Sequence, residues 1–310
     1  MSRDIIILSD GLPGQPGQPD MALPLSPEDL AAVHPLWAGD AAALGPFAEA
    51  APLGSFGTVR RALGCCGPGV ASSSVAICGS CGSSMDVARR LVVEGALGVW
   101  GSVLAPEQYS GRGQLRRAWL SRPGNLHATL VCPPETGLWN DLRPLVLGYL
   151  FAEALSDLGQ SVQVKWPNDL LSSGRKVAGM LVEERADCVL AGIGLNLCWA
   201  PSSEELRDGH SIGAGKFCPS DGMVGPARIW LALVNRMETS YKNLLEAFSP
   251  SEFLTIFRSR MAWQGRRVLV QEGASVRYEA VVKGISGEGG LVLDRAGLEI
   301  VLLAGDVTPV

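Results

Sequence analysis

The residues between 165 and 179 carry the side chains of this chain that are best suited to binding an anion. Lys165 and Lys176 supply two positive charges, and Asn168 and Asp169 add an amide and a carboxylate. Lysine binds a phosphate as a point charge, and an amide adds neutral hydrogen bonds. The stretch therefore predicts a site for a phosphate ester. Taken alone, it also fits a solvent-exposed hairpin, in which lysines are edge charges and Asn-Asp only forms a turn.

A second stretch, residues 108–119, favours the functional interpretation. Gly111 and Gly113 let the backbone approach an anion closely, and Trp119 offers its face to a flat ring. Forked guanidinium donors belong to the same loop. They come from Arg112, Arg116 and Arg117.

A pair of hydroxyl groups lies farther upstream. Ser83 and Ser84 fall between a strand predicted over 75–78 and a helix that starts near Asp86. Hydroxyls and free backbone amides at such a turn bind ligands, although the same residues also serve as plain helix caps.

Strands and helices must position these side chains. Val162, Val164 and Trp166 alternate with polar residues, which predicts a strand, and Pro167 ends it. A second strand, a glycine turn and a third strand that carries Lys176 at its start follow. Other strands are expected over 5–8, 98–104 and 188–197, and helices over 29–32, 41–51, 141–158 and 226–248.

The end of the chain has a different pattern. Ser249 and Glu252 form a capping box for a short helix, and short apolar runs between glycine-rich turns follow it. These runs are typical of a small separate β-barrel. Its strands are expected over 268–270, 278–282, 291–293 and 300–303.

Composition excludes several classes of protein. The chain has 310 residues, 47% hydrophobic and 18% charged, which is typical of a folded protein large enough for more than one domain. Its net charge of −5 argues against non-specific nucleic-acid binding. No apolar run is long enough to span a bilayer, and the N-terminal one is too short for a secretory signal. We expect a cytoplasmic protein without nucleic-acid or membrane partners.

Four cysteines cluster between residues 65 and 81. Cys78 and Cys81 have the C-x-x-C spacing of zinc and redox sites, but Cys65 and Cys66 are adjacent and no histidine is near. An apolar run precedes Cys78, so both thiols fit a buried strand as small hydrophobes. The sequence favours this structural role, and no metal site is predicted.

Seven short motifs together resemble the biotin–protein ligase family. They are Gly-Ser-Ser-Met-Asp (82–86), Gln-x-x-Gly-Arg-Gly (108–113), Arg-Ala-Trp (117–119), Gly-Asn-Leu (124–126), Lys-Trp-Pro-Asn-Asp (165–169), Gly-Arg-Lys-Val-Ala-Gly (174–179) and Gly-x-Gly-x-Asn (192–196). The resemblance implies an α+β fold, in which a mixed β-sheet is flanked by helices as in class II synthetases, with a small C-terminal β-barrel. It also implies a catalytic biotin- and ATP-binding domain over 73–262 and a barrel domain over 263–310. Residues 1–72 match no motif, and are expected to be a small accessory domain or an extension packed on the catalytic domain.

The family's reaction has two steps. Biotin and Mg²⁺-ATP form biotinyl-5'-AMP and pyrophosphate. A lysine of a carboxylase's biotin carrier domain then attacks the mixed anhydride and releases AMP. Carried over by position, the catalytic residues are Lys176, Lys165 and Asp169. The biotin-binding residues are Ser83, Ser84, Met85, Gln108, Gly111, Arg112, Gly113, Gln114, Lys176 and Gly179. The ATP-binding residues are Arg112, Arg117, Trp119, Lys165, Asn168, Lys176 and Asn196.

The chain departs from the family pattern at two places. Ser84 replaces a common threonine, which keeps the hydroxyl, and Gln114 stands where arginine is common. An amide forms one charge-assisted hydrogen bond fewer than arginine. We expect the adenylate to be held less tightly, unless Arg116 compensates.

Two other functions remain open. A lipoate or octanoate ligase or transferase shares the fold and a similarly placed lysine, but its apolar substrate does not need the polar Gln108 loop. A non-catalytic biotin sensor or repressor is the other alternative, although no basic recognition helix is visible in residues 1–72. The resemblance is compatible with a monomer or a homodimer.

Overall fold

The computed structural model describes residues 3–14, 19–52, 57–63, 73–114, 117–185, 188–206, 212–220, 222, 224–273 and 275–310. The chain divides into two compact units. The first comprises Met1–Pro134, Gly179–Trp199 and Cys218–Asn235, and the second comprises Glu135–Ala178, Ala200–Phe217 and Arg236–Val310. The three-part division of the sequence at residues 72 and 262 stays a prediction.

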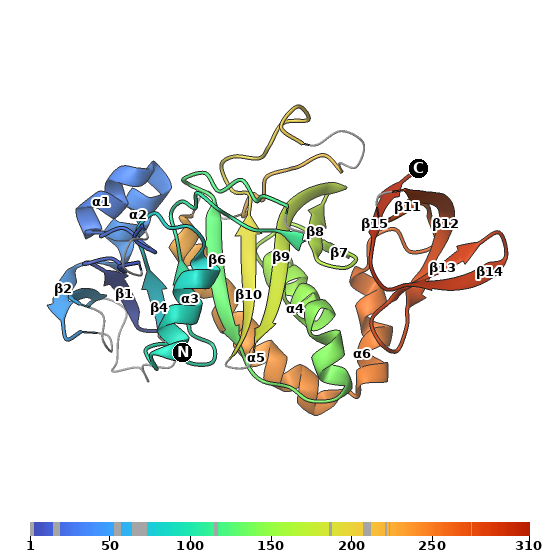
Figure 1. The fold of residues 1–310 in the computed structure, drawn as a ribbon, viewed down its shortest axis with the longest axis horizontal. Coiled ribbons are helices and arrows are strands. Elements are labelled where there is room, and N and C mark those ends of the chain that lie inside the picture. The colour runs from blue at the N-terminus through green and yellow to red at the C-terminus, as the bar shows by residue number, and fades with distance from the viewer. Residues whose placement is uncertain are drawn as a thin grey trace. The chain divides into compact units, whose positions relative to one another are not determined.

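The first unit is built on a mixed sheet (Figure 1). Its strands follow one another in the order β2-β3-β1-β4-β5-β6-β10. β1 runs parallel to β4, and β4 parallel to β5, whereas the β1/β3, β5/β6 and β6/β10 pairs are antiparallel. The strands are β1 (Ile5–Leu8), β2 (Phe47–Ala50), β3 (Val59–Ala62), β4 (Val75–Ile77), β5 (Ser102–Leu104), β6 (Leu126–Cys132) and β10 (Cys188–Leu195).

Helices cover both faces of this sheet. Val103 of β5 packs in one core cluster with Ala88 and Leu91 of helix α3 (Ser84–Val93). Its neighbour Ser102 points to the opposite face, because strand side chains alternate, and accepts a hydrogen bond from Trp230 Nε1 over 2.8 Å. Trp230 belongs to α5 (Pro226–Ala247), so α3 and the first turns of α5 lie on opposite faces.

The N-terminal segment is part of this sheet. β1 lies between β3 and β4, and all four of its residues are buried. Arg3 Nη1 donates to the Trp100 carbonyl over 2.7 Å. Two helices, α1 (Pro27–Val33) and α2 (Pro35–Leu44), follow β1, and the buried Asp40 of α2 accepts from Ala227 N over 2.6 Å. The carboxylate of Asp40 therefore caps the start of α5.

Two predictions from periodicity were wrong in part. The helix expected over 41–51 ends at Leu44, and Phe47–Ala50 is a strand instead, because Gly45-Pro46 interrupts the helical pattern. The strand expected over 98–104 begins only at Ser102. Trp100 has a φ of 64°, a left-handed conformation that a regular strand cannot contain.

The second unit contains the hairpin that the lysine motif predicted. β8 (Asp169–Ser172) pairs antiparallel with β7 (Gln163–Lys165) and lies next to β9 (Arg175–Arg185). The residues of β9 from Gly179 onward belong to the first unit. Helix α4 (Leu138–Asp157) packs on β7 and β8 and against α6 (Pro250–Phe257). The capping box of Ser249 and Glu252 at the start of α6 is confirmed.

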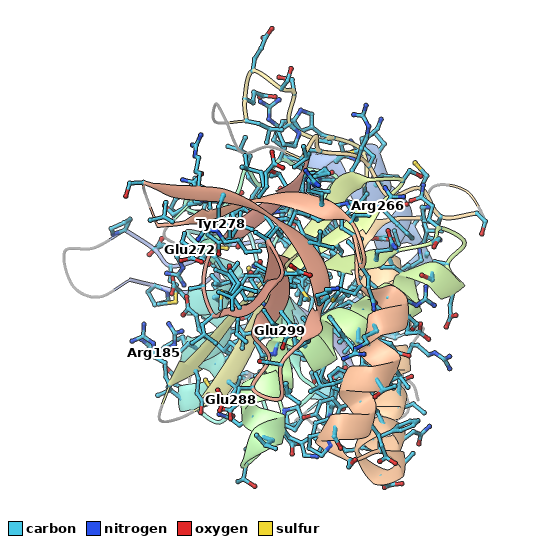
Figure 2. The ribbon with its side chains drawn as sticks, turned by 90° about the vertical axis from the view of Figure 1, so that its right-hand side faces the viewer. Arg185, Arg266, Glu272, Tyr278, Glu288 and Glu299 are labelled. Carbon is cyan, nitrogen blue, oxygen red and sulfur yellow. The ribbon has the colours of Figure 1, made fainter. Side chains whose placement is uncertain are left out.

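The C-terminal segment forms the predicted small antiparallel sheet, and its closure into a barrel stays a prediction. Its order is β14-β13-β12-β11-β15, and no described residues pair β14 with β15 to close it. The strands are β11 (Arg267–Glu272), β12 (Val276–Ile285), β13 (Leu291–Arg295), β14 (Leu298–Leu302) and β15 (Asp306–Pro309). The Tyr278 hydroxyl donates to Glu272 across β11 and β12 (Figure 2). Burial, together with this hydrogen bond, raises the pKa of Tyr278 to about 12. β15 was missed because Asp306 and Pro309 disfavour a strand.

Candidate active site

A chain of hydrogen-bonded polar side chains crosses the start of α3 in the first unit. Ser83 caps the helix, and the Ser84 backbone amide donates to Gln108 Oε1 over 2.7 Å. The Ser84 hydroxyl lies 2.8 Å from the Thr129 hydroxyl of β6. Gln108 Nε2 in turn donates to Ser121 Oγ over 2.8 Å. The serines and the glutamine predicted to bind biotin therefore lie close together. Hydrogen bonds fix the orientation of the Ser84 hydroxyl and the Gln108 amide.

The loop between Gln108 and Ser121 folds back on itself. Isolated bridges join Gln108 to Ser121 and Arg112 to Ala118, and Gly113 N donates to the Arg117 carbonyl over 2.7 Å. A Cβ at Gly111 would lie 2.5 Å from the Trp119 carbonyl, so this position requires glycine. Arg112 donates to both carboxylate oxygens of Asp86, over 2.8 and 3.1 Å. Gln114 and Arg117 are exposed, and Arg116 lies outside the described residues.

The two glycines of β10 lie beneath larger side chains. A Cβ on Gly194 would be 2.2 Å from the Trp119 ring, and one on Gly192 would be 2.8 Å from the Met85 sulfur. Trp119 and Met85 therefore rest directly on the strand backbone. The absent side chains give a flat floor on which a ring can stack.

The end of β10 is held by a single amide side chain. Asn125 Oδ1 accepts from the backbone N–H groups of Leu197, Cys198 and Trp199 over 2.9, 3.1 and 3.1 Å. Its Nδ2 donates back to the Trp199 carbonyl over 2.8 Å. The chain around Asn196, which is buried and predicted to bind ATP, is thereby fixed.

A cluster of lysines and carboxylates lies in the second unit. Asp169 is the shared partner, because Lys165 Nζ lies 3.1 Å from its Oδ2 and Lys176 Nζ lies 2.5 Å from its Oδ1. Lys165 Nζ also contacts Oδ1 of Asp306 over 2.6 Å. The side chain of Lys165 is 5% exposed and that of Lys176 is 31% exposed. Of these two lysines, Lys176 is the one whose side chain remains partly exposed.

Opposite charges keep this cluster ionised. Burial acts to raise the pKa of Asp169, but the nearby Lys176 and Lys165 outweigh it and lower that pKa below its usual value. Burial acts to lower the pKa of Lys165, but Asp169 and Asp306 outweigh it and raise that pKa. Both groups therefore stay charged at neutral pH.

The backbone around Lys176 is paired with a distant segment. Lys176 N donates to the Gly213 carbonyl over 3.0 Å, and Gly215 N donates to the Lys176 carbonyl over 2.9 Å. These bonds fix the start of β9 and therefore the direction in which Lys176 leaves the backbone. Asn168 lies half-buried in the turn before β8, and Gly179 is buried in β9.

The chain is similar to known protein ligases in family, sequence and structure. Residues 96–196 match the model of the biotin/lipoate A/B protein ligase family. The biotin–[acetyl-CoA-carboxylase] ligase of Paracoccus denitrificans is 30% identical over 212 residues, which are 64% of this chain and 86% of that protein. The chain belongs to the biotin–protein ligase family. A ligase of the same description from Mycobacterium tuberculosis is 27% identical and covers 66% of this chain and 77% of its own length.

Solved structures of biotin–protein ligases share this fold. The biotin protein ligase of Aquifex aeolicus, in complex with biotin and ATP, has a TM-score of 0.62 and 26% identity, and covers 76% of this chain and 97% of its own. The Leishmania major enzyme, in complex with biotinyl-5-AMP, has a TM-score of 0.54 at 23% identity, and covers 77% of this chain and 100% of its own. The mixed sheet flanked by helices that the motifs implied is confirmed.

Four residues of this biotin–protein ligase that contact predicted site residues, or fix the chain beside them, were not assigned a role from sequence. Thr129 and Ser121 bond to Ser84 and Gln108, Asn125 fixes the end of β10, and Asp306 pairs with Lys165. Their contacts join residues far apart in the chain, and a lone threonine in a strand or an aspartate near a turn gives no local signal. Of the four, Asn125 alone had a local sequence signal, because it belongs to the Gly-Asn-Leu motif.

The cysteine motif lies inside the core of the first unit. Cys78 and Cys81 are free, buried and part of the cluster that contains Met85. The hydrogen bond between the two thiols and their burial raise the pKa of Cys81. A thiol that stays protonated is a poor metal ligand. No group of three or more His, Cys, Asp or Glu in the described chain could hold a metal ion, and Cys65 and Cys66 lie outside it.

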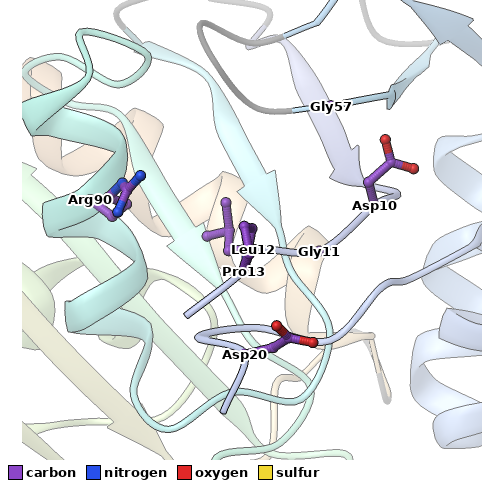
Figure 3. A pocket seen from close by; sticks show the side chains of 7 residues that line it. All are labelled: Asp10, Gly11, Leu12, Pro13, Asp20, Gly57 and Arg90. Atoms are coloured by element: carbon purple, nitrogen blue, oxygen red, sulfur yellow. The ribbon is translucent and has the colours of Figure 1, made fainter. Parts of the chain in front are cut away.

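A separate cavity of about 330 Å³ lies at the end of β1 (Figure 3). It is lined by Asp10, Gly11, Leu12, Pro13, Asp20, Gly57 and Arg90. None of the predicted site residues lines it. Asp10 accepts from the Thr58 amide over 2.5 Å, and Arg90 pairs with Glu94, so these two charged groups have partners within the chain.

None of the helices in the described part of the chain is both long and apolar enough to cross a membrane.

Proposed function

We propose that this chain is an ATP-dependent biotin–protein ligase that forms biotinyl-5'-AMP and transfers biotin to a lysine of a biotin carrier domain. The observation that carries the proposal is the polar chain from Thr129 through Ser84 and Gln108 to Ser121, because a ureido ring needs both donors and acceptors. The similarity to a named biotin–[acetyl-CoA-carboxylase] ligase over 86% of its length supports the same reaction.

In the first step the carboxylate of biotin attacks the α-phosphorus of ATP. A bond forms between carboxylate oxygen and phosphorus, and the bond to the β-phosphate oxygen breaks, releasing pyrophosphate. Negative charge grows on the phosphate oxygens, so a nearby cation accelerates the step. Lys176 is the catalytic residue in this proposal, because it is the lysine of the cluster that remains partly exposed. Mg²⁺ enters as part of the Mg²⁺-ATP substrate.

Lys165 and Asp169 act through Lys176. Lys165 is almost fully buried between two carboxylates, so in this proposal it orients Asp169, and its predicted contact with Mg²⁺-ATP is kept as a proposal. Asp169 holds the ammonium group of Lys176 at the start of β9. Because the two lysines lower the pKa of Asp169, it is a weak base at neutral pH. We therefore assign Asp169 a positioning role and not that of proton acceptor for the incoming amine.

The remaining contacts follow the family's pattern. Trp119 stacks on the adenine, and Arg112 exchanges Asp86 for the ligand when biotin or phosphate is bound. The other predicted contacts are kept as proposals. They are Ser83, Met85, Gly111, Gly113, Gln114 and Gly179 for biotin, and Arg117, Asn168 and Asn196 for Mg²⁺-ATP. A cytoplasmic location, the absence of a nucleic-acid partner and a monomeric or dimeric state also stay predictions.

Exchange of labelled pyrophosphate into ATP tests the proposal. We expect exchange that depends on biotin and not on octanoate, and a loss of at least about 100-fold in Lys176→Met, since removing one charge-stabilising donor costs roughly 10²–10³ in rate. Lys242→Met is the control, because Lys242 is exposed and forms an ion pair with Glu238, one turn away on α5. Octanoate-dependent exchange would identify a lipoate-type ligase, and no exchange would identify a biotin sensor.

A further inference from the structure

A buried histidine on β6 has an unusual environment. His127 is 1% exposed, and its Nδ1 lies 3.4 Å from the Ala105 carbonyl oxygen. Its Nε2 is buried and has no hydrogen-bond partner among the described residues. Leaving a buried polar atom unpaired is costly, so such an atom calls for an explanation.

The strand register places His127 on the floor of the candidate site. His127 is paired with Gly194, and Thr129 with Gly192. Residues two apart on a strand share a face, and so do directly paired residues of neighbouring strands. Thr129 contacts Ser84 and Gly194 lies under Trp119, so the imidazole lies on the same face as both. His127 thus occupies the row between the residues assigned to biotin and the tryptophan assigned to adenine.

The chemistry of the ring follows from its neighbours. A carbonyl oxygen only accepts, so Nδ1 carries the proton and Nε2 is the acceptor. Burial lowers the pKa of His127 to about 4, against weaker opposing effects of the Ala105 and Pro106 carbonyls. The imidazole is therefore neutral at pH 7, and the lone pair of its Nε2 has no hydrogen-bond donor among the described residues.

We propose that His127 is a ligand-binding residue of this site, whose Nε2 accepts a hydrogen bond from an N–H or O–H group of a bound substrate. The inference rests on the proposed function. Two substrates can supply this donor: biotin has ureido N–H groups, and ATP has an adenine amino group and ribose hydroxyls. In the proposed function biotin lies near Thr129 and the adenine of ATP lies near Trp119, so either substrate could reach His127. The experiment below distinguishes the two.

Two substitutions separate the ring nitrogens. Asn in His127→Asn can keep a donor near the Nδ1 position and lacks the Nε2 acceptor. Gln in His127→Gln can place its carbonyl oxygen near the Nε2 position. His34→Asn is the matched control, because His34 caps α2, where asparagine is also a good cap. Each protein is titrated calorimetrically with biotin and, separately, with a non-hydrolysable ATP analogue, and its thermal unfolding is recorded.

We expect His127→Asn to weaken the binding of one substrate by about 3- to 10-fold, the value of one neutral hydrogen bond, and His127→Gln to recover part of it. Weaker biotin binding assigns the donor to biotin, and weaker analogue binding assigns it to the nucleotide. Unchanged affinities for both in a wild-type background that catalyses exchange would overturn the inference and leave the ligase assignment intact. A wild type that binds neither compound would overturn both.

A measurement on the unaltered protein guards against misfolded variants. With ¹⁵N-labelled histidine, we expect the Nε2 resonance of His127 to shift when the assigned substrate is added, because an accepted hydrogen bond changes the shielding of that nitrogen. The Nδ1 resonance and both His34 resonances are expected to stay in place. An unshifted Nε2 signal at saturating biotin and saturating analogue would overturn the inference.

Discussion

Asp169 separates two ammonium groups that would otherwise repel each other. Lys165 and Lys176 contact different oxygens of its carboxylate, and Asp306 balances the second charge. An arrangement of two cations and two anions is neutral as a whole. Such an arrangement keeps buried lysines ionised. It also lets one lysine contact a phosphate while the other keeps its carboxylate partners.

Removing the shared carboxylate is expected to destabilise the protein. Asp169→Asn removes the carboxylate that Lys165 and Lys176 share, and breaking a buried pair costs roughly 3–5 kcal/mol. Urea unfolding at pH 7 measures the loss. Glu279→Gln is the control, because the Arg267–Glu279 pair is exposed and such pairs contribute about 0–1 kcal/mol.

The same variant carries a pH signature. The folded-state pKa of Asp169 is lowered, so its stabilisation is present above its unfolded pKa of about 3.9 and is lost as the pH falls through the folded value. The folded-state pKa of Lys165 is raised, so its stabilisation is lost only as the pH rises above about 10.4. We expect the gap in unfolding free energy between wild type and Asp169→Asn to narrow below about pH 4. A gap that stays constant down to pH 2 would contradict this account.

Gln114 offers a prediction on ligand retention. Its side chain is exposed at the tip of the arginine loop, where the family commonly has arginine. Gln114→Arg adds a charged donor, and we expect biotinyl-5'-AMP to dissociate about 10-fold more slowly. Single-turnover release of the labelled adenylate measures the rate. Equal rates in the two proteins would show that this position does not reach the phosphate.

At the scale of elements, β10 determines where Trp119 lies. A Cβ at position 194 would be 2.2 Å from the indole ring, so Gly194→Ala must displace it. We expect the KM for ATP to rise by about 10-fold, since base–aromatic stacking is worth roughly 1–3 kcal/mol, with a smaller change in the KM for biotin. Gly39→Ala in α2 is the control, because its nearest contact would be an ordinary 3.5 Å. Parallel increases in both KM values would contradict a specific stacking role.

Local patterns and long-range contacts differ in how well sequence predicts them. The amphipathic stripe of α5 and the capping box of α6 were predicted because their signals lie within one or two turns. β15 and the pairing of β1 between β3 and β4 were not, since a short strand depends on partners elsewhere. The site shows the same division. Ser84, Gln108 and Lys176 belong to motifs, whereas Thr129, His127 and Asp306 acquire their roles only through folding.

At the scale of the whole molecule, the C-terminal sheet contributes to the lysine cluster. Asp306 begins β15, and its Oδ1 also accepts from the Val307 amide over 2.9 Å, so its carboxylate is fixed by its own strand. The sheet therefore supplies a charge to a hairpin built from residues far earlier in the chain.

Asp306→Asn tests whether that charge affects catalysis. We expect biotin-dependent exchange to fall by about 10-fold, because the orientation of Asp169 and hence of Lys176 relaxes, while biotin affinity stays within about 2-fold. Combined with Asp169→Asn, the effects on unfolding free energy should be non-additive by about 0.5–3 kcal/mol, as expected for residues in one network. Additive effects would show that the two carboxylates act separately.

The inserted position of β1 limits how this chain can be shortened. A fragment beginning at residue 73 retains the whole stretch matched by the family model, yet it uncovers the backbone of β4 along its parallel edge and the apolar residues Val75, Ala76 and Ile77. Unpaired edges of this kind recruit other chains and lead to aggregation. Trimming guided by motif boundaries would thus yield insoluble material, and a usable fragment has to start before Ile5.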